Sequence, residues 1–150
     1  MAKPFEPVMD ADDIENFIDA HFPQVHMDGR VLAVTSVAPG AVTVRLEPNE
    51  RHLRPGGTIS GPTLFTVADL AAYYVILAHI GPVALVVTTN LNINFVHRAA
   101  PGPLSCVARL LKLGKRLAVT DVSIEDGAGT LVAHATATYS IPPDREFMVK

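Results

Sequence analysis

Asp69 is the residue of this sequence whose surroundings most require a chemical explanation. It is the only formal charge between Arg54 and Arg98, and it lies inside a strongly apolar stretch, residues 61–79. Removing an unpaired carboxylate from water costs several kcal/mol, which is comparable with the whole stability of a small domain. We therefore expect Asp69 to have a bonding partner, a shifted protonation equilibrium or a catalytic function at a cavity.

Charged residues gather in two runs of opposite sign. From residue 10 to 28 every charge is acidic, and the charges from 98 to 116 are all basic: Arg98, Arg109, Lys112, Lys115 and Arg116. Either run is compatible with a solvated surface, and the basic run can also bind a small polyanion such as a nucleotide. The net charge of −3 gives the whole chain no electrostatic attraction to nucleic acid or to an anionic membrane.

Cysteine and histidine usage excludes a disulfide framework and argues against a metal site. The single cysteine, Cys106, cannot form an intrachain disulfide and fits a reducing compartment, so we expect a cytoplasmic protein. The six histidines are scattered, without the spacing of a zinc site. The N-terminus lacks the apolar core of a signal peptide, and residues 61–80 carry too many polar side chains to favour a membrane span.

The apolar stretch around Asp69 is predicted to be a helix that is buried on most sides. Ser60 is a typical N-cap residue, and Pro62 suits the first turn, where its missing N–H breaks no helical bond. Apolar residues lie all round this helix, and Gly81-Pro82 ends it. No histidine or acid lies near Ser60 in the sequence to activate it as a nucleophile, so we interpret it as the cap.

The remaining residues predict one more helix and six strands. An amphipathic helix begins at Asp10 and stops at Pro23, and Pro39-Gly40 is typical of a hairpin turn. The predicted strands are residues 31–38, 41–47, 84–97, 103–113, 116–125 and 130–140. The last strand alternates, with Leu131, three alanines and Tyr139 on the face that would meet the buried helix.

This order predicts a single α+β domain over residues 1–150, in which an antiparallel six-stranded sheet wraps around the long central helix. The N-terminal helix covers about 10–22, the core about 25–141, and residues 142–150 form a loose tail. The outer face of the sheet is only partly polar and its edges need cover, so we expect a homo-oligomer, either a dimer or a dimer of dimers.

Four short motifs follow one another along the chain: Ser60-Gly61-Pro62 with Asp69, residues 88–102, residues 112–116 and residues 126–135. In this order and spacing they resemble the hotdog-fold acyl-CoA thioesterases, specifically the PaaI-like branch, over residues 25–141. That family has His-Gly-Gly at the start of the central helix and an acidic residue where Asp69 stands. The other three motifs are similar to its third strand and loop, its Gly-basic hairpin and its Asp-x-x-Gly-x-Leu-Val-Ala-x-Ala ending.

The resemblance implies an acyl-CoA thioesterase that hydrolyses a medium-chain or aromatic acyl-CoA, with coenzyme A as part of the substrate and no separate cofactor. Asp69 would act as nucleophile or as general base for a water, the Gly61 N–H would polarise the thioester carbonyl, and Thr88 would position the water. A helix N-terminus suits the negative charge that acyl transfer builds on the carbonyl oxygen. In dimers of this family the acid and the N–H donor come from different subunits, which implies a composite site.

The resemblance also implies a set of substrate-binding residues: Arg54, Ser60, Asn92, His97, Arg98, Lys115 and Arg116. Arg54 stands where the family often has Asn, and it can pair with Asp69 or bind an anionic substrate group. Pro62 removes one backbone donor at the helix start. These two departures support a second hypothesis, a non-catalytic hotdog domain that binds a CoA-like or acidic ligand.

Overall fold

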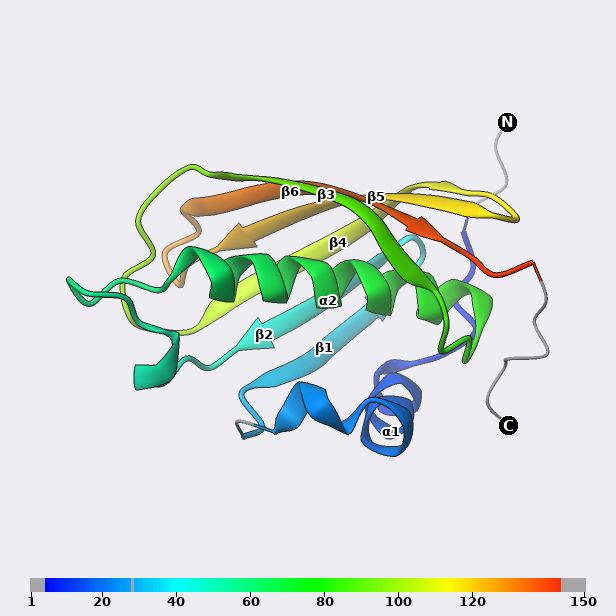
Figure 1. The fold of residues 1–150 in the computed structure, drawn as a ribbon, viewed down its shortest axis with the longest axis horizontal. Coiled ribbons are helices and arrows are strands. Elements are labelled where there is room, and N and C mark those ends of the chain that lie inside the picture. The colour runs from blue at the N-terminus through cyan, green and yellow to red at the C-terminus, as the bar shows by residue number, and fades with distance from the viewer. Residues whose placement is uncertain (1–4, 28, 144–150) are drawn as a thin grey trace.

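The computed structural model describes residues 5–27 and 29–143, so Asp28 and most of the predicted tail lie outside the described residues. Six strands form one antiparallel sheet in the order β1-β2-β4-β5-β6-β3, and helix α2 lies along one face of it (Figure 1). The strands are β1 (Leu32–Ala38), β2 (Ala41–Leu46), β3 (Val87–Phe95), β4 (Leu104–Leu113), β5 (Leu117–Glu125) and β6 (Leu131–Ser140). The helices are α1 (Ala11–His21) and α2 (Gly61–Ile80), with short 3-10 turns η1 (Pro23–His26) and η2 (Glu50–His52). The predicted fold class is confirmed.

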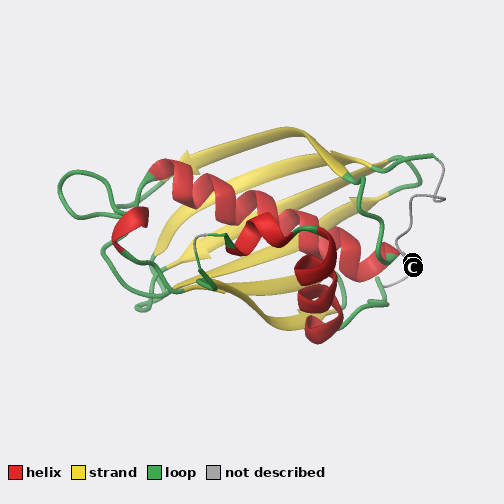
Figure 2. Ribbon diagram, turned by 60° about the horizontal axis from the view of Figure 1, so that its bottom comes forward, coloured by secondary structure: helices red, strands yellow, loops and turns green. Residues whose placement is uncertain are grey.

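Helix α2 is the centre of the hydrophobic core, and the sheet curves around it (Figure 2). Ser60 caps its N-terminus, because its hydroxyl accepts a hydrogen bond from the Thr63 N–H at 3.3 Å. Every residue in the range 71–79 is buried. The helix is long and apolar enough to cross a membrane, but 67% of its most apolar window is buried inside the protein, as in the core helix of a globular domain.

Strand alternation brings small side chains against α2. In β6 the residues Ala133, Ala135, Ala137 and Tyr139 are all buried, as the sequence predicts. Because alanine side chains are short, this face lets the sheet approach the helix closely. Tyr139 is the exception, since it is a large buried side chain in an otherwise small-residue row.

Strand β3 is shorter than predicted and forms one edge of the sheet. The sequence predicts a strand over 84–97, whereas β3 spans Val87–Phe95. Residues 83–86 turn instead, with the Val86 N–H donating to the Val83 carbonyl at 3.4 Å, and pairing with β6 begins only at Val87 opposite Ser140. Val87 and Phe95 are 52% and 55% exposed, so this edge presents apolar side chains to the exterior.

Helix α1 closes the side of the sheet at β1 (Figure 1). Asp10 and Asp13 form a reciprocal capping box at its start, and the helix buries Ile14, Phe17 and Ile18 against the core. The following turn η1 continues from this helix toward β1. Together they form one wall of the space beside α2.

The buried His79 fastens the end of α2 to the β1–β2 turn. Its Nε2 accepts the Gly40 N–H at 2.9 Å, so the ring proton is on Nδ1, which donates to the Val75 carbonyl at 2.7 Å. Gly40 has φ +74°, a conformation that glycine adopts without strain. Burial lowers the pKa of His79, with a smaller opposing effect of its bond to Val75. The neutral ring therefore belongs to the folded state.

This arrangement predicts a loss of stability at acid pH. Because the folded-state pKa of His79 is lowered, the unfolded chain binds the proton more readily. The contribution of His79 is full above its unfolded-state pKa of about 6.5 and is lost as the pH falls from there to the folded-state pKa. The measurement is the free energy of unfolding from urea denaturation, at about pH 7.5 and at about pH 5.5. We expect it to decrease less over this range in His79→Gln than in wild type.

The exposed His97 provides the matched control. His97→Gln removes an exposed imidazole and leaves the bonds of His79 to Gly40 and Val75 in place, so it shows whether loss of any histidine gives the effect. An identical pH dependence in wild type and His79→Gln would show that His79 is not the titrating group.

Candidate active site

Two hydroxyl groups hold the carboxylate of Asp69. The side chain is only partly buried, half-way along α2. Thr88 donates from its Oγ1 to Asp69 Oδ1 at 2.8 Å, and the Tyr139 hydroxyl lies 2.5 Å from the same oxygen and 2.6 Å from the Asp69 backbone carbonyl. A hydrogen bond to a charged group contributes about 1.5–3 kcal/mol, so two of them offset much of the cost of removing this carboxylate from water.

The register of the sheet brings these two hydroxyls together. Thr88 in β3 pairs directly with Tyr139 in β6, so both side chains leave the sheet on the side of α2. The ladder is irregular between Thr88 and Asn90, and bulges of this kind often redirect a side chain beside a functional site. The contact therefore joins residues far apart in the sequence, at 69, 88 and 139.

Tyr139 is a permanent donor at neutral pH. Burial raises the pKa of Tyr139, and the charge of Asp69 and the hydrogen bond to it raise this pKa further. Burial also raises the pKa of the neighbouring Tyr73, to about 12. Both phenols therefore keep their protons, and Tyr139 can act toward Asp69 only as a neutral O–H group.

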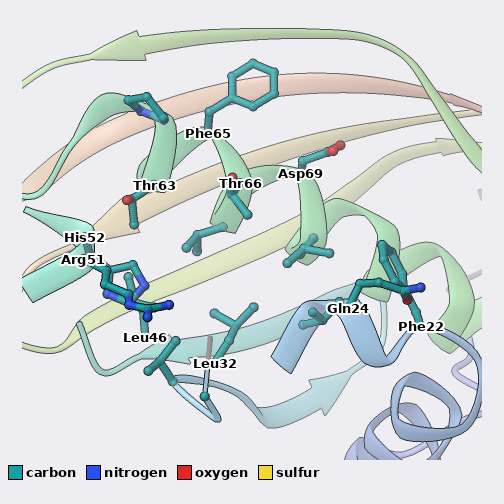
Figure 3. Close-up of a pocket in the computed structure, with 16 residues that line it drawn as sticks. Phe22, Gln24, Leu32, Leu46, Arg51, His52, Thr63, Phe65, Thr66 and Asp69 are labelled. Atoms are coloured by element: carbon teal, nitrogen blue, oxygen red, sulfur yellow. The ribbon is translucent and has the colours of Figure 1, made fainter. Parts of the chain in front are cut away.

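A cavity of about 570 Å³ lies beside Asp69, between α2 and the wall formed by η1, β1, β2 and η2. Its apolar lining includes Phe22, Val25, Leu32, Leu46, Phe65 and Leu70. In Figure 3, Arg51 and His52 lie at the end near Thr63, while Phe22 and Gln24 lie at the other end, beyond Asp69. His52 accepts the Asn49 N–H on its Nδ1 at 2.8 Å, so the neutral ring carries its proton on Nε2.

A second cavity, of about 560 Å³, lies at the N-terminus of α2. It gathers five residues that the resemblance implies, namely Arg54, Ser60, Gly61, His97 and Arg98, beside the exposed ring of Phe95. A Cβ atom at position 61 would lie 3.2 Å from Phe95 Cζ, so glycine gives this helix start the room it needs. Two arginines and the Gly61 N–H at the start of the helix make the second cavity suitable for an anion.

The structure does not bring all the predicted site residues together within one chain. Asp69 and Gly61 line different cavities and are separated by eight residues of helix, a rise of about 12 Å. Arg54 lies with Gly61 and not with Asp69, whose Oδ1 bonds to Thr88 and Tyr139. A carbonyl group that contacts both the Gly61 N–H and Asp69 would therefore need a second copy of the chain.

Three other predicted residues lie away from both cavities. Lys115 and Arg116 are exposed on the β4–β5 turn, at the opposite end of β4 from Arg98, and a ten-residue strand spans about 30 Å. Asn92 lies between Leu91 and Ile93 in β3, and alternation turns it to the face of the sheet opposite α2. One chain thus does not place Lys115, Arg116 and Arg98 around a single phosphate. Their role as coenzyme contacts stays a prediction.

Sequence reasoning missed Tyr139, Arg51 and His52. The alternation of the last strand already places Tyr139 on the face that meets the central helix. Because Asp69 is the only acid on that helix, a hydrogen bond between the Tyr139 hydroxyl and Asp69 could have been predicted from the sequence. Arg51 and His52 belong to a polar loop whose path the sequence does not give. Among the described residues, no cluster of three or more histidine, cysteine or acidic side chains could hold a metal ion.

Known proteins share both the sequence pattern and the fold of this chain. A family model described as the thioesterase superfamily matches residues 56–133, a range that contains Gly61, Asp69 and Thr88. The chain belongs to the thioesterase superfamily. The six-stranded antiparallel sheet around a central helix is the hotdog fold of these thioesterases, which confirms the fold that the sequence implies.

Two solved structures illustrate how widely this fold is shared. A protein of Silicibacter sp. TM1040 that is named as a thioesterase is 45% identical, covers 93% of this chain and 96% of its own, and superposes with a TM-score of 0.83. A mutant form of the phenylacetic acid degradation protein PaaI of Thermus thermophilus is 26% identical over 85% of this chain and 99% of its own, with a TM-score of 0.67. The PaaI-like resemblance is confirmed.

Curated relatives carry hydrolase names. A Saccharolobus solfataricus protein named as an esterase is 36% identical over 62% of this chain, and the match spans 61% of that relative's own length. The 1,4-dihydroxy-2-naphthoyl-CoA hydrolase of Listeria monocytogenes is 24% identical over 77% of this chain and 94% of its own. These names are the hydrolase names of the relatives themselves, and they agree with the place of the chain in the thioesterase superfamily.

Proposed function

We propose that this protein hydrolyses acyl-CoA thioesters with a medium-chain or aromatic acyl group, in the cytoplasm. The observation that carries the proposal is the Asp69 carboxylate, which two hydroxyls of β3 and β6 hold. Asp69 also lines a cavity of about 570 Å³ with many apolar side chains, although its carboxylate points away from Leu32 and Leu46 on the far wall (Figure 3). Such a cavity suits an apolar acyl group. Membership of the thioesterase superfamily and the CoA hydrolase among its relatives support the same reaction.

Asp69 and the start of α2 divide the chemistry between them. Asp69 attacks the thioester carbonyl as nucleophile or removes a proton from the water that attacks it. The Gly61 N–H donates to the carbonyl oxygen, on which negative charge develops. One such donor contributes about 3 kcal/mol of transition-state stabilisation, so the loss of a second donor at Pro62 leaves a functional site.

The second cavity is proposed to receive the coenzyme A portion of the substrate, including one of its anionic phosphate groups. Arg54 and Arg98 supply positive charge there, and His97 and Ser60 supply hydrogen-bonding groups. The structure separates Arg54 from Asp69, which favours a role toward an anionic group of the ligand over pairing with the catalytic carboxylate. Lys115 and Arg116, on the distant turn, are proposed to reach the ligand from another copy of the chain.

A homodimer would complete the site. Asp69 and Gly61 lie about 12 Å apart along one helix, farther than a single carbonyl group can bridge. Strand β3 is an edge strand whose backbone can pair with another strand, and its Val87 and Phe95 side chains are more than half exposed. We propose that two copies associate along β3, so that Asp69 of one copy faces Gly61 of the other.

A panel of acyl-CoA thioesters tests the activity. Wild type should release free thiol from medium-chain or aromatic acyl-CoA, followed with a thiol reagent. Asp69→Asn keeps the size and the hydrogen-bonding shape of the side chain, so it should fold normally and lose at least about 100-fold in kcat. Equal release by wild type and Asp69→Asn from every thioester would contradict the proposal.

The same panel separates the binding hypothesis from the enzyme. A non-catalytic domain would retain added acyl-CoA in a stable complex from which the thioester is recovered intact. Rapid turnover by wild type excludes that alternative. The binding hypothesis rests on Arg54 and Pro62. Recovery of intact ligand would therefore assign the absence of turnover to these two residues.

Mixing two inactive variants tests the composite site. Asp69→Asn and Gly61→Val each damage one half of the site. If the halves come from different chains, half of a randomly mixed population consists of mixed dimers that carry one intact site, giving about a quarter of wild-type activity. No recovery of activity, with mixed dimers verified by mass spectrometry, would show that each site is built within one chain.

A further inference from the structure

We propose that Tyr139 is a positioning residue which, together with Thr88, fixes Oδ1 of Asp69 and leaves Oδ2 as the oxygen that reacts. This inference rests on the proposed function of Asp69. It assigns different roles to the two carboxylate oxygens of Asp69, since Oδ1 is held in place and Oδ2 reacts. It also identifies Tyr139 as a residue that affects the reaction through Asp69, without contact to the substrate.

The hydrogen bonds select one carboxylate oxygen. Thr88 and Tyr139 both donate to Oδ1, at 2.8 Å and 2.5 Å. Within residues 5–27 and 29–143, the structure shows no donor to Oδ2. An oxygen that already accepts two hydrogen bonds has fewer lone-pair directions left, so Oδ2 is the atom available to attack a carbonyl carbon or to accept a proton from water.

Two acceptors also fix the rotation of the carboxylate relative to its own helix. The Tyr139 hydroxyl lies 2.6 Å from the backbone carbonyl oxygen of Asp69 as well as 2.5 Å from Oδ1. The phenol therefore joins the side chain and the main chain of one residue. Rotation of the side chain about χ1 or χ2 would move Oδ1 away from this pair of contacts.

The side chain of Tyr139 is itself held in place by its surroundings, so its hydroxyl can fix the position of the Asp69 carboxylate. Its side chain is 2% exposed, and its ring stacks on Tyr73 with centroids 6.4 Å apart and an interplanar angle of 25°. Its backbone pairs with Thr88 on one side and with Ala118 on the other. Burial and the neighbouring carboxylate raise the pKa of Tyr139, so the group remains an O–H donor throughout the neutral range.

Two hydroxyl deletions with a matched control test this role. Tyr139→Phe and Thr88→Val each remove one donor to Oδ1. Tyr73→Phe also removes a buried phenol hydroxyl, but that hydroxyl donates to the Ala84 carbonyl at 3.1 Å and does not bond to Asp69. We expect kcat to fall about 10- to 100-fold in the first two variants with KM nearly unchanged, because a misaligned reactive atom slows the chemical step.

The control variants should behave differently. Tyr73→Phe should keep the wild-type kcat, and Thr88→Ser, which retains a hydroxyl, should recover most of the activity lost in Thr88→Val. Thermal unfolding of all variants separates slower chemistry from a loss of fold. A wild-type kcat in Tyr139→Phe, or equal losses in Tyr139→Phe and Tyr73→Phe, would overturn the inference.

The outcome also distinguishes this inference from the proposed function. If Asp69→Asn abolishes turnover but Tyr139→Phe does not lower kcat, Asp69 is catalytic and the positioning role is wrong. A readout independent of activity is the crystal structure of each variant. Asp69 should adopt more than one rotamer in Tyr139→Phe and a single rotamer in Tyr73→Phe, and a single unchanged rotamer in both would contradict the proposal.

Discussion

The hydrogen bonds between the Asp69 carboxylate and the Thr88 and Tyr139 hydroxyls are the interaction on which this architecture depends. The Asp69 carboxylate, half-way along the core helix, is partly removed from water, and the hydroxyls that reach it from the sheet offset part of that cost. Both donors come from paired residues of β3 and β6, strands that are adjacent in space and distant in sequence. The direct pairing of Thr88 with Tyr139, next to the irregularity between Thr88 and Asn90, brings these two hydroxyls to one oxygen.

The packing around this contact explains the composition of the last strand. Alanines at 133, 135 and 137 let the sheet lie close to α2, and Tyr139 then fills the space beside Asp69. A larger residue in the alanine row would lift the sheet from the helix and lengthen the hydroxyl contacts. Two cavities lie elsewhere along α2, one lined by Asp69 and residues of β1 and β2, and one at the helix N-terminus.

Local signals in the sequence predicted the elements well, because each rests on neighbours along the chain. The Asp10 and Ser60 caps, the Pro39-Gly40 turn and the alternation of the strands all depend on a few consecutive residues. The start of β3 was predicted three residues too early, since Leu85 and Val86 are apolar like a strand but belong to a turn. Apolar character alone does not separate the two.

Only part of the candidate site was predicted, because the sequence reveals local features and not contacts between distant strands. Asp69 is visible as a lone charge in an apolar helix, and Thr88 and Gly61 followed from the resemblance. Tyr139 was not identified as its partner, because that contact depends on the pairing register of β3 with β6, which no local pattern gives. The separation of Arg98 from Lys115 and Arg116 likewise follows from the length of β4 and the path of the chain.

The most direct test of this account is a crystal structure of the protein with a non-hydrolysable acyl-CoA analogue in which a ketone replaces the thioester. We expect the ketone oxygen within hydrogen-bond distance of the Gly61 N–H of one copy. The ketone carbon should face Asp69 Oδ2 of the other, while Oδ1 keeps its bonds to Thr88 and Tyr139. An analogue bound away from Asp69, or a complex in which Asp69 turns from these hydroxyls to pair with Arg54, would contradict the account.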